Sequence, residues 1–334
     1  MRVVQLVHPK KGRHVAIVDE PTLVLLEDTT SVYSLAIKAV KEGGSITQLA
    51  TSRRSSTNLR YDEVYEGASE WQLLPAFDHP TDPQHCMLSG TGLTHKASAE
   101  NRQKMHQAQE DNTSTDSMKM YQWGVAGGRP NEGRVGVQPE WFYKGNGVVL
   151  KGHGDTLSVP PYADDGGEEP EVAGVYVNDH QGCPWRIGYT TANEFSDHVM
   201  ERKNYLYLAP SKIRTCAIGP ELIIGGEFKD ISGRVSIHRS GSVLWEKLVC
   251  TGEQHMAHSL SNLEYHHFKY ENHRVPGQAH VHFFGADAFS FGEGISLTNG
   301  DRMEVQWSGM GRPLRNTIAV ASEEERIITV KEIK

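Results

Sequence analysis

Two glutamates separated by a single proline constrain this chain most. Glu169 and Glu171 precede the apolar run VAGVYV (172–177), and Pro170 between them suits the start or edge of a strand, because it has no backbone N–H to donate. Side chains two apart in a strand project from the same face. Two adjacent carboxylates repel each other unless a proton or cation separates them, which favours Mg²⁺ or Mn²⁺. The alternative is an acidic turn, DDGGEEPE, with every carboxylate solvated.

The composition sets the class of protein. A chain of 334 residues is too long for one minimal core, so we expect a large domain with a smaller companion. Its mean hydropathy is -0.50, and it has no apolar run near the ~20 residues of a membrane span. The net charge of -8, without a basic cluster, disfavours nucleic-acid binding. Four scattered cysteines and a start without a signal-peptide pattern predict a cytoplasmic protein with reduced thiols.

The first part of the chain predicts a small α/β domain, residues 1–84. Short strands are expected at 3–7, 14–18 and 22–27, followed by a helix that Ser31 caps and that ends at Gly43 and Gly44. Residues 45–84 are polar and rich in proline near their end, which is typical of a linker. Residues 85–334 predict a β-rich second domain, so the expected fold class is α+β.

Two segments of the second domain differ from its short strands. Residues 96–134 are polar, with an amphipathic stretch around SAENRQKMHQAQ, and predict either a mobile lid or a surface excursion. Residues 258–271 have a helix-like pattern. His280 and His282 lie on one face of a strand, but their spacing to the next glutamate is unlike a metal motif, so packing or polar lining is favoured.

A third carboxylate completes the candidate metal site. The spacing from Glu171 to Glu194 suits one strand, a turn and a second strand, which would bring Glu194 to the first pair. Three acidic ligands leave Mg²⁺ with open positions for water or substrate. A 2-oxo acid could chelate through its carboxylate and keto oxygens, and the metal would stabilise the enolate.

The order of several segments resembles the fumarylacetoacetate hydrolase family along nearly the whole second domain. The segments are LSGTGLTH, EWFYKGNGVVLKGHGDTLSVP, EPEVAGVYV, GYTTANEFSDH, SKIRTCAIGP and GDRMEVQWSGMGRPLRNT. Within the family the chain is most similar to the GguC-like branch, which is linked to dehydration of 2-keto-3-deoxy-pentonates such as L-2-keto-3-deoxyarabonate. The resemblance implies a small N-terminal domain followed by a mixed β-roll or sandwich catalytic domain, and a homodimer.

The resemblance also assigns metal ligands. Glu169 and Glu171 match the E-x-E ligands, and Glu194 stands where the family usually has an aspartate. Because Glu194 is one methylene longer, Asp197 and Asp179 remain alternative third ligands. The implied ion is Mg²⁺, with Mn²⁺ or Ca²⁺ as alternatives.

Three further residues take catalytic roles by resemblance. Lys212 matches the lysine that faces the oxo-acid end of the substrate. His95 matches the histidine that serves in acid/base work on water. Its acidic partner normally follows three positions later, where this chain has Ser98, and the next carboxylate is Glu100. The histidine–glutamate dyad of a hydrolase is thereby weakened.

A weakened dyad favours a lyase, because a C–C hydrolase needs an activated water whereas a dehydratase needs an acidified C3 proton and help for the departing C4 hydroxyl. We therefore expect a Mg²⁺-dependent dehydratase of a 2-keto-3-deoxy sugar acid that forms 2,5-dioxopentanoate in pentose catabolism. The alternatives are a C–C hydrolase of acylpyruvate-like diketo acids, a decarboxylase or isomerase of oxo acids, and a non-catalytic sugar-acid binding protein.

Overall fold

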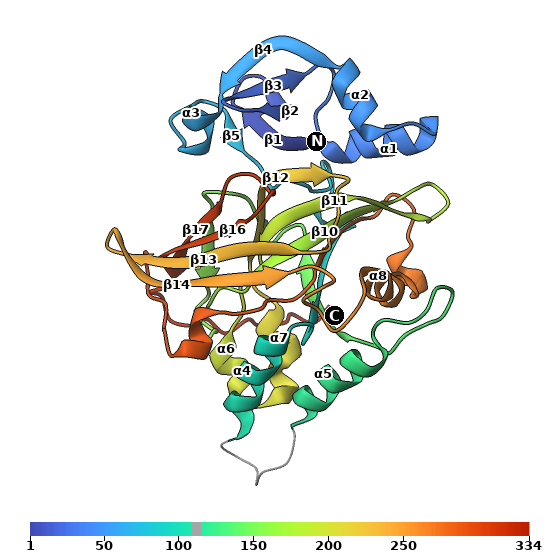
Figure 1. Cartoon of the computed structure of the whole chain (residues 1–334). Coiled ribbons are helices and arrows are strands. Elements are labelled where there is room, and N and C mark those ends of the chain that lie inside the picture. Colours follow the sequence, from blue (N-terminus) through green and yellow to red (C-terminus); the bar gives the residue numbers. More distant parts are fainter. Residues whose placement is uncertain (108–114, 334) are drawn as a thin grey trace.

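The computed structural model describes residues 1–107 and 115–333, and two β-sheets form its centre (Figure 1). The large sheet has 12 strands, with the main order β4-β3-β2-β1-β12-β11-β10-β15-β6-β7, while β5 pairs with β1 and β8 with β12. The small sheet has five strands in the order β14-β13-β16-β17-β9. Sheet therefore dominates a mixed α and β fold, as the sequence predicted.

The large sheet consists of β1 (Arg2–His8), β2 (Gly12–Asp19), β3 (Thr22–Leu26), β4 (Arg54–Arg60), β5 (Gln72–Leu73), β6 (Cys86–Gly92), β7 (Glu140–Asn146), β8 (Leu150–Lys151), β10 (Pro170–Asn178), β11 (Pro184–Asn193), β12 (Cys216–Ile224) and β15 (Ala279–Phe283). The small sheet consists of β9 (Thr156–Val159), β13 (Ile231–Arg239), β14 (Ser242–Thr251), β16 (Arg302–Trp307) and β17 (Leu314–Val320). The helices are α1 (Val32–Glu42), α2 (Ile46–Ser52), α3 (Tyr61–Tyr65), α4 (Lys96–Gln107), α5 (Asp116–Gly127), α6 (His198–Lys203), α7 (Leu208–Lys212) and α8 (Leu260–Phe268). In the part of the chain that the structure describes, four 3-10 turns are η1 (Pro83–His85), η2 (Tyr205–Tyr207), η3 (Glu271–His273) and η4 (Ser290–Glu293).

The elements predicted for the first 44 residues are confirmed. Strands β1, β2 and β3 occupy the three alternating segments, and α1 follows them. The Ser31 side chain accepts a hydrogen bond from the Ser34 N–H at the start of α1, and Gly43 ends it in the left-handed conformation with φ of 63°. The cap residues therefore set both ends of this helix.

The predicted linker at 45–84 is wrong. This segment contains α2, β4, α3 and β5, and Tyr61, Val64, Tyr65 and Trp71 are buried against β1–β3 in one core. Strand β4 lies at the edge of the large sheet and its side chains are mostly exposed, so it carries little apolar signal. The helical spacing of Tyr61, Val64 and Tyr65 was the available signal for α3.

The N-terminal strands belong to the same sheet as the rest of the chain. Strand β1 pairs antiparallel with β12, where Arg2 faces Ile223 and Val3 faces Leu222. The N-terminal strands lie at one end of the molecule, whereas α4, α6 and α7 lie at the other (Figure 1). The domain boundary at residue 84 stays a prediction.

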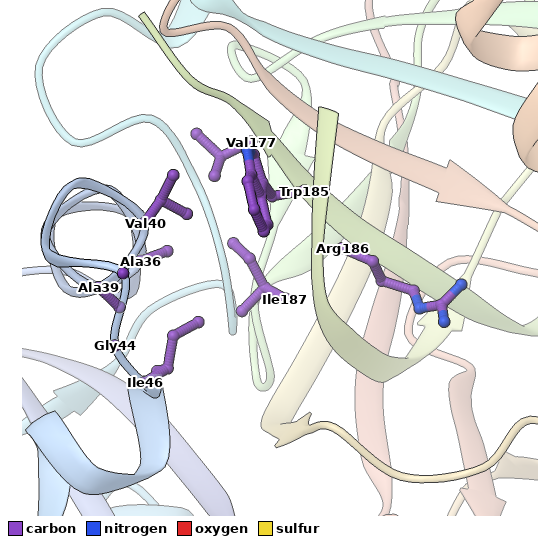
Figure 2. A pocket seen from close by; sticks show the side chains of 10 residues that line it. Ala36, Ala39, Val40, Gly44, Ile46, Val177, Trp185, Arg186 and Ile187 are labelled. Carbon is purple, nitrogen blue, oxygen red and sulfur yellow. The ribbon is translucent and has the colours of Figure 1, made fainter. Parts of the chain in front are cut away.

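Helix α1 covers one face of the large sheet and leaves a small cavity. Its apolar side joins β10, β11 and β15 in a common core. A cavity of about 210 Å³ remains between α1 and the β10–β11 hairpin, where Ala36 and Val40 face Val177 and Ile187 (Figure 2). The other face of the large sheet packs on the small sheet through a second core that contains Val172, Phe284 and Trp307.

The segments at 96–134 and 258–271 form helices. Helices α4 and α5 lie in the first, and Thr115 caps α5; residues 108–114 of the predicted lid lie outside the described residues. Helix α8 confirms the second prediction. Among the described residues, no helix has the length and apolar character required to cross a membrane.

Candidate metal centre

Three buried carboxylates meet at one end of the β10–β11 hairpin. Each of Glu169, Glu171 and Glu194 offers an oxygen, and these oxygens lie within 4.8 Å of one another. The hairpin brings them together, because Glu171 pairs with Ala192 and the Glu194 N–H donates to the Glu169 carbonyl at 3.0 Å. The strand–turn–strand spacing predicted from the sequence is therefore confirmed.

Lys212 lies directly on this cluster. Its Nζ donates to Glu169 Oε1 at 2.5 Å and to Glu194 Oε2 at 2.7 Å, and it is 3.1 Å from Ser196 Oγ. The lysine ends the short helix α7, and its side chain is 1% exposed. An ammonium group in this position bridges two of the three carboxylates.

The three carboxylates have unequal proton affinities. Burial raises the pKa of Glu171 well above its usual range, and the negative charges of Glu194 and Glu169 raise it further. Burial and Glu169 also raise the pKa of Glu194, to about 7. Burial alone would raise the pKa of Glu169 too, but Lys212 and His198 lower it well below the usual range. Such mutual repulsion is what a divalent cation relieves.

A backbone donor and an indole fix Glu171. The Gly285 N–H donates to Glu171 Oε2 at 2.6 Å, and Trp307 Nε1 donates to the Glu171 carbonyl at 2.8 Å. Gly285 has φ of +96°, and a Cβ there would lie 2.1 Å from Thr94 Oγ1, so only glycine fits. One oxygen of Glu171 is thereby left for a cation.

His198 holds Glu169 from the other side. Its Nε2 lies 3.1 Å from Glu169 Oε1, and its ring stacks on Phe289 and Phe291 at centroid distances of 4.8 and 5.1 Å. Burial lowers the pKa of His198, but Glu169 and Asp165 raise it above the usual value in sum. The sequence carried this histidine within GYTTANEFSDH without indicating its role.

His95 is fully hydrogen-bonded and is connected to the cluster through Thr94, which lies against Gly285, the backbone donor to Glu171. Thr94 Oγ1 donates to the Phe284 carbonyl at 2.8 Å, so the 2.9 Å contact between His95 Nδ1 and Thr94 Oγ1 needs a proton on Nδ1. In the neutral ring, Nε2 then accepts from Thr251 Oγ1 at 3.1 Å. Burial, with a smaller contribution from His255, lowers the pKa of His95 to about 3. His95 is therefore neutral at pH 7.

The remaining candidates lie elsewhere. The exposed carboxylate of Glu100 is 3.5 Å from Lys96 Nζ, so its predicted role beside His95 stays a prediction. Asp179 accepts hydrogen bonds from Gln181, Cys183 and Trp185 in the hairpin turn. Asp197 caps α6 and pairs with Arg214 at 2.9 Å. Glu194 is the third carboxylate that the structure brings to the pair.

Two buried cations near the site escaped sequence reasoning. Lys144 Nζ is 2.9 Å from Glu194 Oε1, and Arg102 of α4 pairs with Glu140 of β7 at 2.7 Å and Glu201 of α6 at 2.7 Å. Their partners lie 38 to 99 positions away in the sequence, so no local pattern marked them. The Arg102 pairs tie α4 to both neighbouring elements.

A buried histidine cluster occupies a different part of the large sheet. It consists of His267, His273, His280 and His282. His282 is 2.8 Å from both Ser89 Oγ and Thr91 Oγ1, and His267 Nε2 is 3.0 Å from His280 Nδ1. The interpretation of His280 and His282 as packed polar residues agrees with these contacts.

The donor set of the carboxylate cluster fits Mg²⁺. Hard oxygen atoms from three carboxylates converge, and nitrogen or sulfur ligands are absent from the three-residue group. Glu169, Glu171 and Glu194 would hold the ion and leave positions for a chelating substrate.

Comparisons with known proteins find relatives among the sugar-acid dehydratases. No known family profile matches the chain. The 2-dehydro-3-deoxy-D-arabinonate dehydratase of Saccharolobus solfataricus is 34% identical over 122 residues, which are 35% of this chain and 40% of that protein. A probable 2-keto-3-deoxyxylonate dehydratase of Haloferax volcanii is 23% identical over 291 residues, 85% of this chain and 91% of that protein.

Solved structures share the fold. A 2-keto-3-deoxy-D-arabinonate dehydratase complexed with magnesium and 2,5-dioxopentanoate superposes with a TM-score of 0.69, at 19% identity, covering 97% of this chain and 100% of that one. A 5-carboxymethyl-2-hydroxymuconate delta-isomerase from Mycobacterium smegmatis gives 0.58 at 14% identity, covering 96% and 100%. Together these relatives confirm the resemblance to the fumarylacetoacetate hydrolase family, on its 2-keto-3-deoxyarabonate dehydratase-like branch.

Proposed function

We propose that this protein is a Mg²⁺-dependent dehydratase that converts a 2-keto-3-deoxy sugar acid into 2,5-dioxopentanoate. The observation that carries the proposal is the cluster of Glu169, Glu171 and Glu194 within 4.8 Å, with Lys212 bridging two of them. Two relatives whose names state this dehydration support the substrate class. The proposed organisation is a small N-terminal part, residues 1–84, and a catalytic part, residues 85–334, in a cytoplasmic homodimer.

Mg²⁺ at the three carboxylates would withdraw electron density from the C1 and C2 oxygens of the substrate and so acidify C3. The chain itself supplies charge and proton transfer. Burial would lower the pKa of Lys212, but Glu169 and Glu194 raise it above its usual value, so Lys212 carries a proton at Nζ. Lys212 is therefore the group we assign to protonate the departing C4 hydroxyl.

His95 takes the complementary role in this scheme. Its ring is neutral and Nδ1 carries the proton, so Nε2 can accept one after exchanging its Thr251 partner. We assign the C3 proton to this nitrogen. One proton leaves C3 and the C4 hydroxyl leaves as water, which gives a C3=C4 double bond conjugated with the C2 carbonyl. A proton then moves from C5 to C3, and the resulting enol at C4 and C5 relaxes to the aldehyde of 2,5-dioxopentanoate, so no oxidant or reductant is needed.

An end-product assay tests the proposal. L- and D-2-keto-3-deoxy-pentonates are supplied with Mg²⁺ or with EDTA, and both 2,5-dioxopentanoate and pyruvate are measured. We expect metal-dependent 2,5-dioxopentanoate without pyruvate. Pyruvate would indicate C–C cleavage in place of dehydration. If neither product forms from any substrate, in a protein that binds Mg²⁺, the proposed dehydratase activity is refuted.

A further inference from the structure

One face of β7 forms a wall beside the carboxylate cluster. Glu140, Phe142 and Lys144 are buried, whereas Tyr143 between them is 43% exposed, as strand alternation requires. The three inward side chains contact different elements. Glu140 pairs with Arg102, the Phe142 ring lies 4.9 Å from Lys212 Nζ, and Lys144 reaches Glu194.

Lys144 has no exposed surface, and both of its described contacts are with the segment after β11. Its Nζ is 2.9 Å from Glu194 Oε1, and it also donates to the Phe195 carbonyl. Lys212 takes the other oxygen of the same carboxylate, Oε2, at 2.7 Å. Glu194 is thus held between two ammonium groups, one on each oxygen, and Ser196 Oγ donates to it as well.

The charge count explains why two cations are needed. Three buried carboxylates within 4.8 Å carry three negative charges when ionised, and an unpaired buried carboxylate is strongly disfavoured. Lys212 alone spans Glu169 and Glu194 and leaves the cluster two negative charges in excess. Adding Lys144 reduces the excess to one.

We infer that Lys144 is the internal counter-ion that positions Glu194, so that the three carboxylates stand together before the metal arrives. The inference rests on the proposed metal site. Lys144 is a positioning residue, because its described ammonium contacts are with Glu194 and the Phe195 carbonyl, whereas Lys212 bridges Glu169 and Glu194.

Thermal unfolding of the full-length protein in EDTA and in Mg²⁺ tests the inference without any substrate. We expect Lys144→Met to lower the melting temperature in EDTA by roughly 5 to 10 °C, because it leaves a buried charge with one partner fewer. Mg²⁺ replaces the missing positive charge, so it should raise the melting temperature of this variant by several degrees more than that of the wild type. Exposed Lys229→Met is the matched control and should change neither value.

A purely structural lysine gives a different result, namely an equal loss with and without Mg²⁺, and this outcome overturns the inference. The double variant K144M/E194Q removes both partners and is measured in EDTA. We expect it to recover most of the lost stability. If the double variant melts at as low a temperature as Lys144→Met, or fails to fold, the unpaired charge of Glu194 does not explain the lost stability. The inference is then refuted. A wild type that Mg²⁺ does not stabilise overturns it too.

The two proposals fail separately. A protein that shows the expected Mg²⁺-linked difference but forms no 2,5-dioxopentanoate refutes the dehydratase and leaves the role of Lys144 standing. An active dehydratase in which Lys144→Met alters neither the melting temperature nor its response to Mg²⁺ refutes the role of Lys144 alone.

Discussion

The buried histidine cluster should make the protein acid-sensitive between pH 7.5 and 5.5. Burial, with the neighbouring His273 and His282, lowers the pKa of His280 to about 3, and burial with His273 lowers that of His282 to about 3. In the unfolded chain these imidazoles return to 6.5. Below pH 6.5 the unfolded state therefore binds protons that the folded state does not, so stability falls as the pH falls and levels off near pH 3.

The magnitude follows from the size of the shift. A pH of 5.5 lies one unit below the pKa of an imidazole in the unfolded chain, so that imidazole is mostly protonated, while the imidazole in the folded protein stays neutral. Each histidine then costs about 1.4 kcal/mol of the free energy of unfolding relative to pH 7.5. Because His280 and His282 are both buried, solvent screening does not reduce this figure. The pair should cost about 3 kcal/mol.

Urea unfolding in EDTA, followed by tryptophan fluorescence at both pH values, measures this cost. In His282→Gln, the glutamine can still form hydrogen bonds with Ser89 and Thr91, so the variant should fold. Between pH 7.5 and 5.5 its free energy of unfolding should fall by about 1.4 kcal/mol less than that of the wild type. Exposed His180→Gln should lose as much as the wild type. Equal losses in all three proteins would refute the reasoning, because one titrating group would then have been removed without effect.

Three further predictions concern the site and its wall. Glu171→Gln should abolish both turnover and the stabilisation by Mg²⁺ while the far-ultraviolet circular dichroism stays unchanged; full turnover would remove the metal hypothesis. His95→Asn should reduce kcat at least tenfold while the Kd for Mg²⁺, from calorimetry, changes little, and an equal loss of both would show that His95 belongs to the metal site. Gly92→Ala should lower the free energy of unfolding in urea by roughly 1 to 3 kcal/mol, because the added Cβ would lie 1.8 Å from Glu140 Oε2. Gly44→Ala is the control, because its added Cβ meets nothing within 4 Å. An equal loss of stability in both variants would contradict the packing argument.

Local patterns predicted what local physics determines. The caps of α1, the strands β1–β3 and the hairpin that joins Glu171 to Glu194 all depend on residues close in sequence. The polar edge strand β4 was mistaken for a linker, because an edge strand with exposed side chains lacks the apolar alternation that marks a half-buried strand.

Contacts between residues that are distant in the sequence could not be predicted from local patterns. Lys144 contacts Glu194 from 50 positions away in the sequence, and β15 and β6 separate β7 from the β10–β11 hairpin in the order of the sheet, so only the three-dimensional fold brings the two side chains together. The histidine cluster likewise combines β15 and α8 with β6, and its hydrogen bonds depend on the register of the parallel β6–β15 pair, where Ser89 faces His282. Neither the charge pair nor this register has a signature in a single sequence.

The pairing of β1 with β12 bears on how the chain can be shortened. In the intact protein β12 is an interior strand with β11 on one side and β1 on the other. Deleting the N-terminal strands would leave the backbone N–H and C=O groups of β12 without partners along the apolar segment Ile223–Ile224. Such an edge recruits strands from other molecules, so a truncated catalytic part would tend to aggregate even with every metal ligand present. The first strand thus covers an edge of β12 that would otherwise be open to pairing with a strand of another molecule.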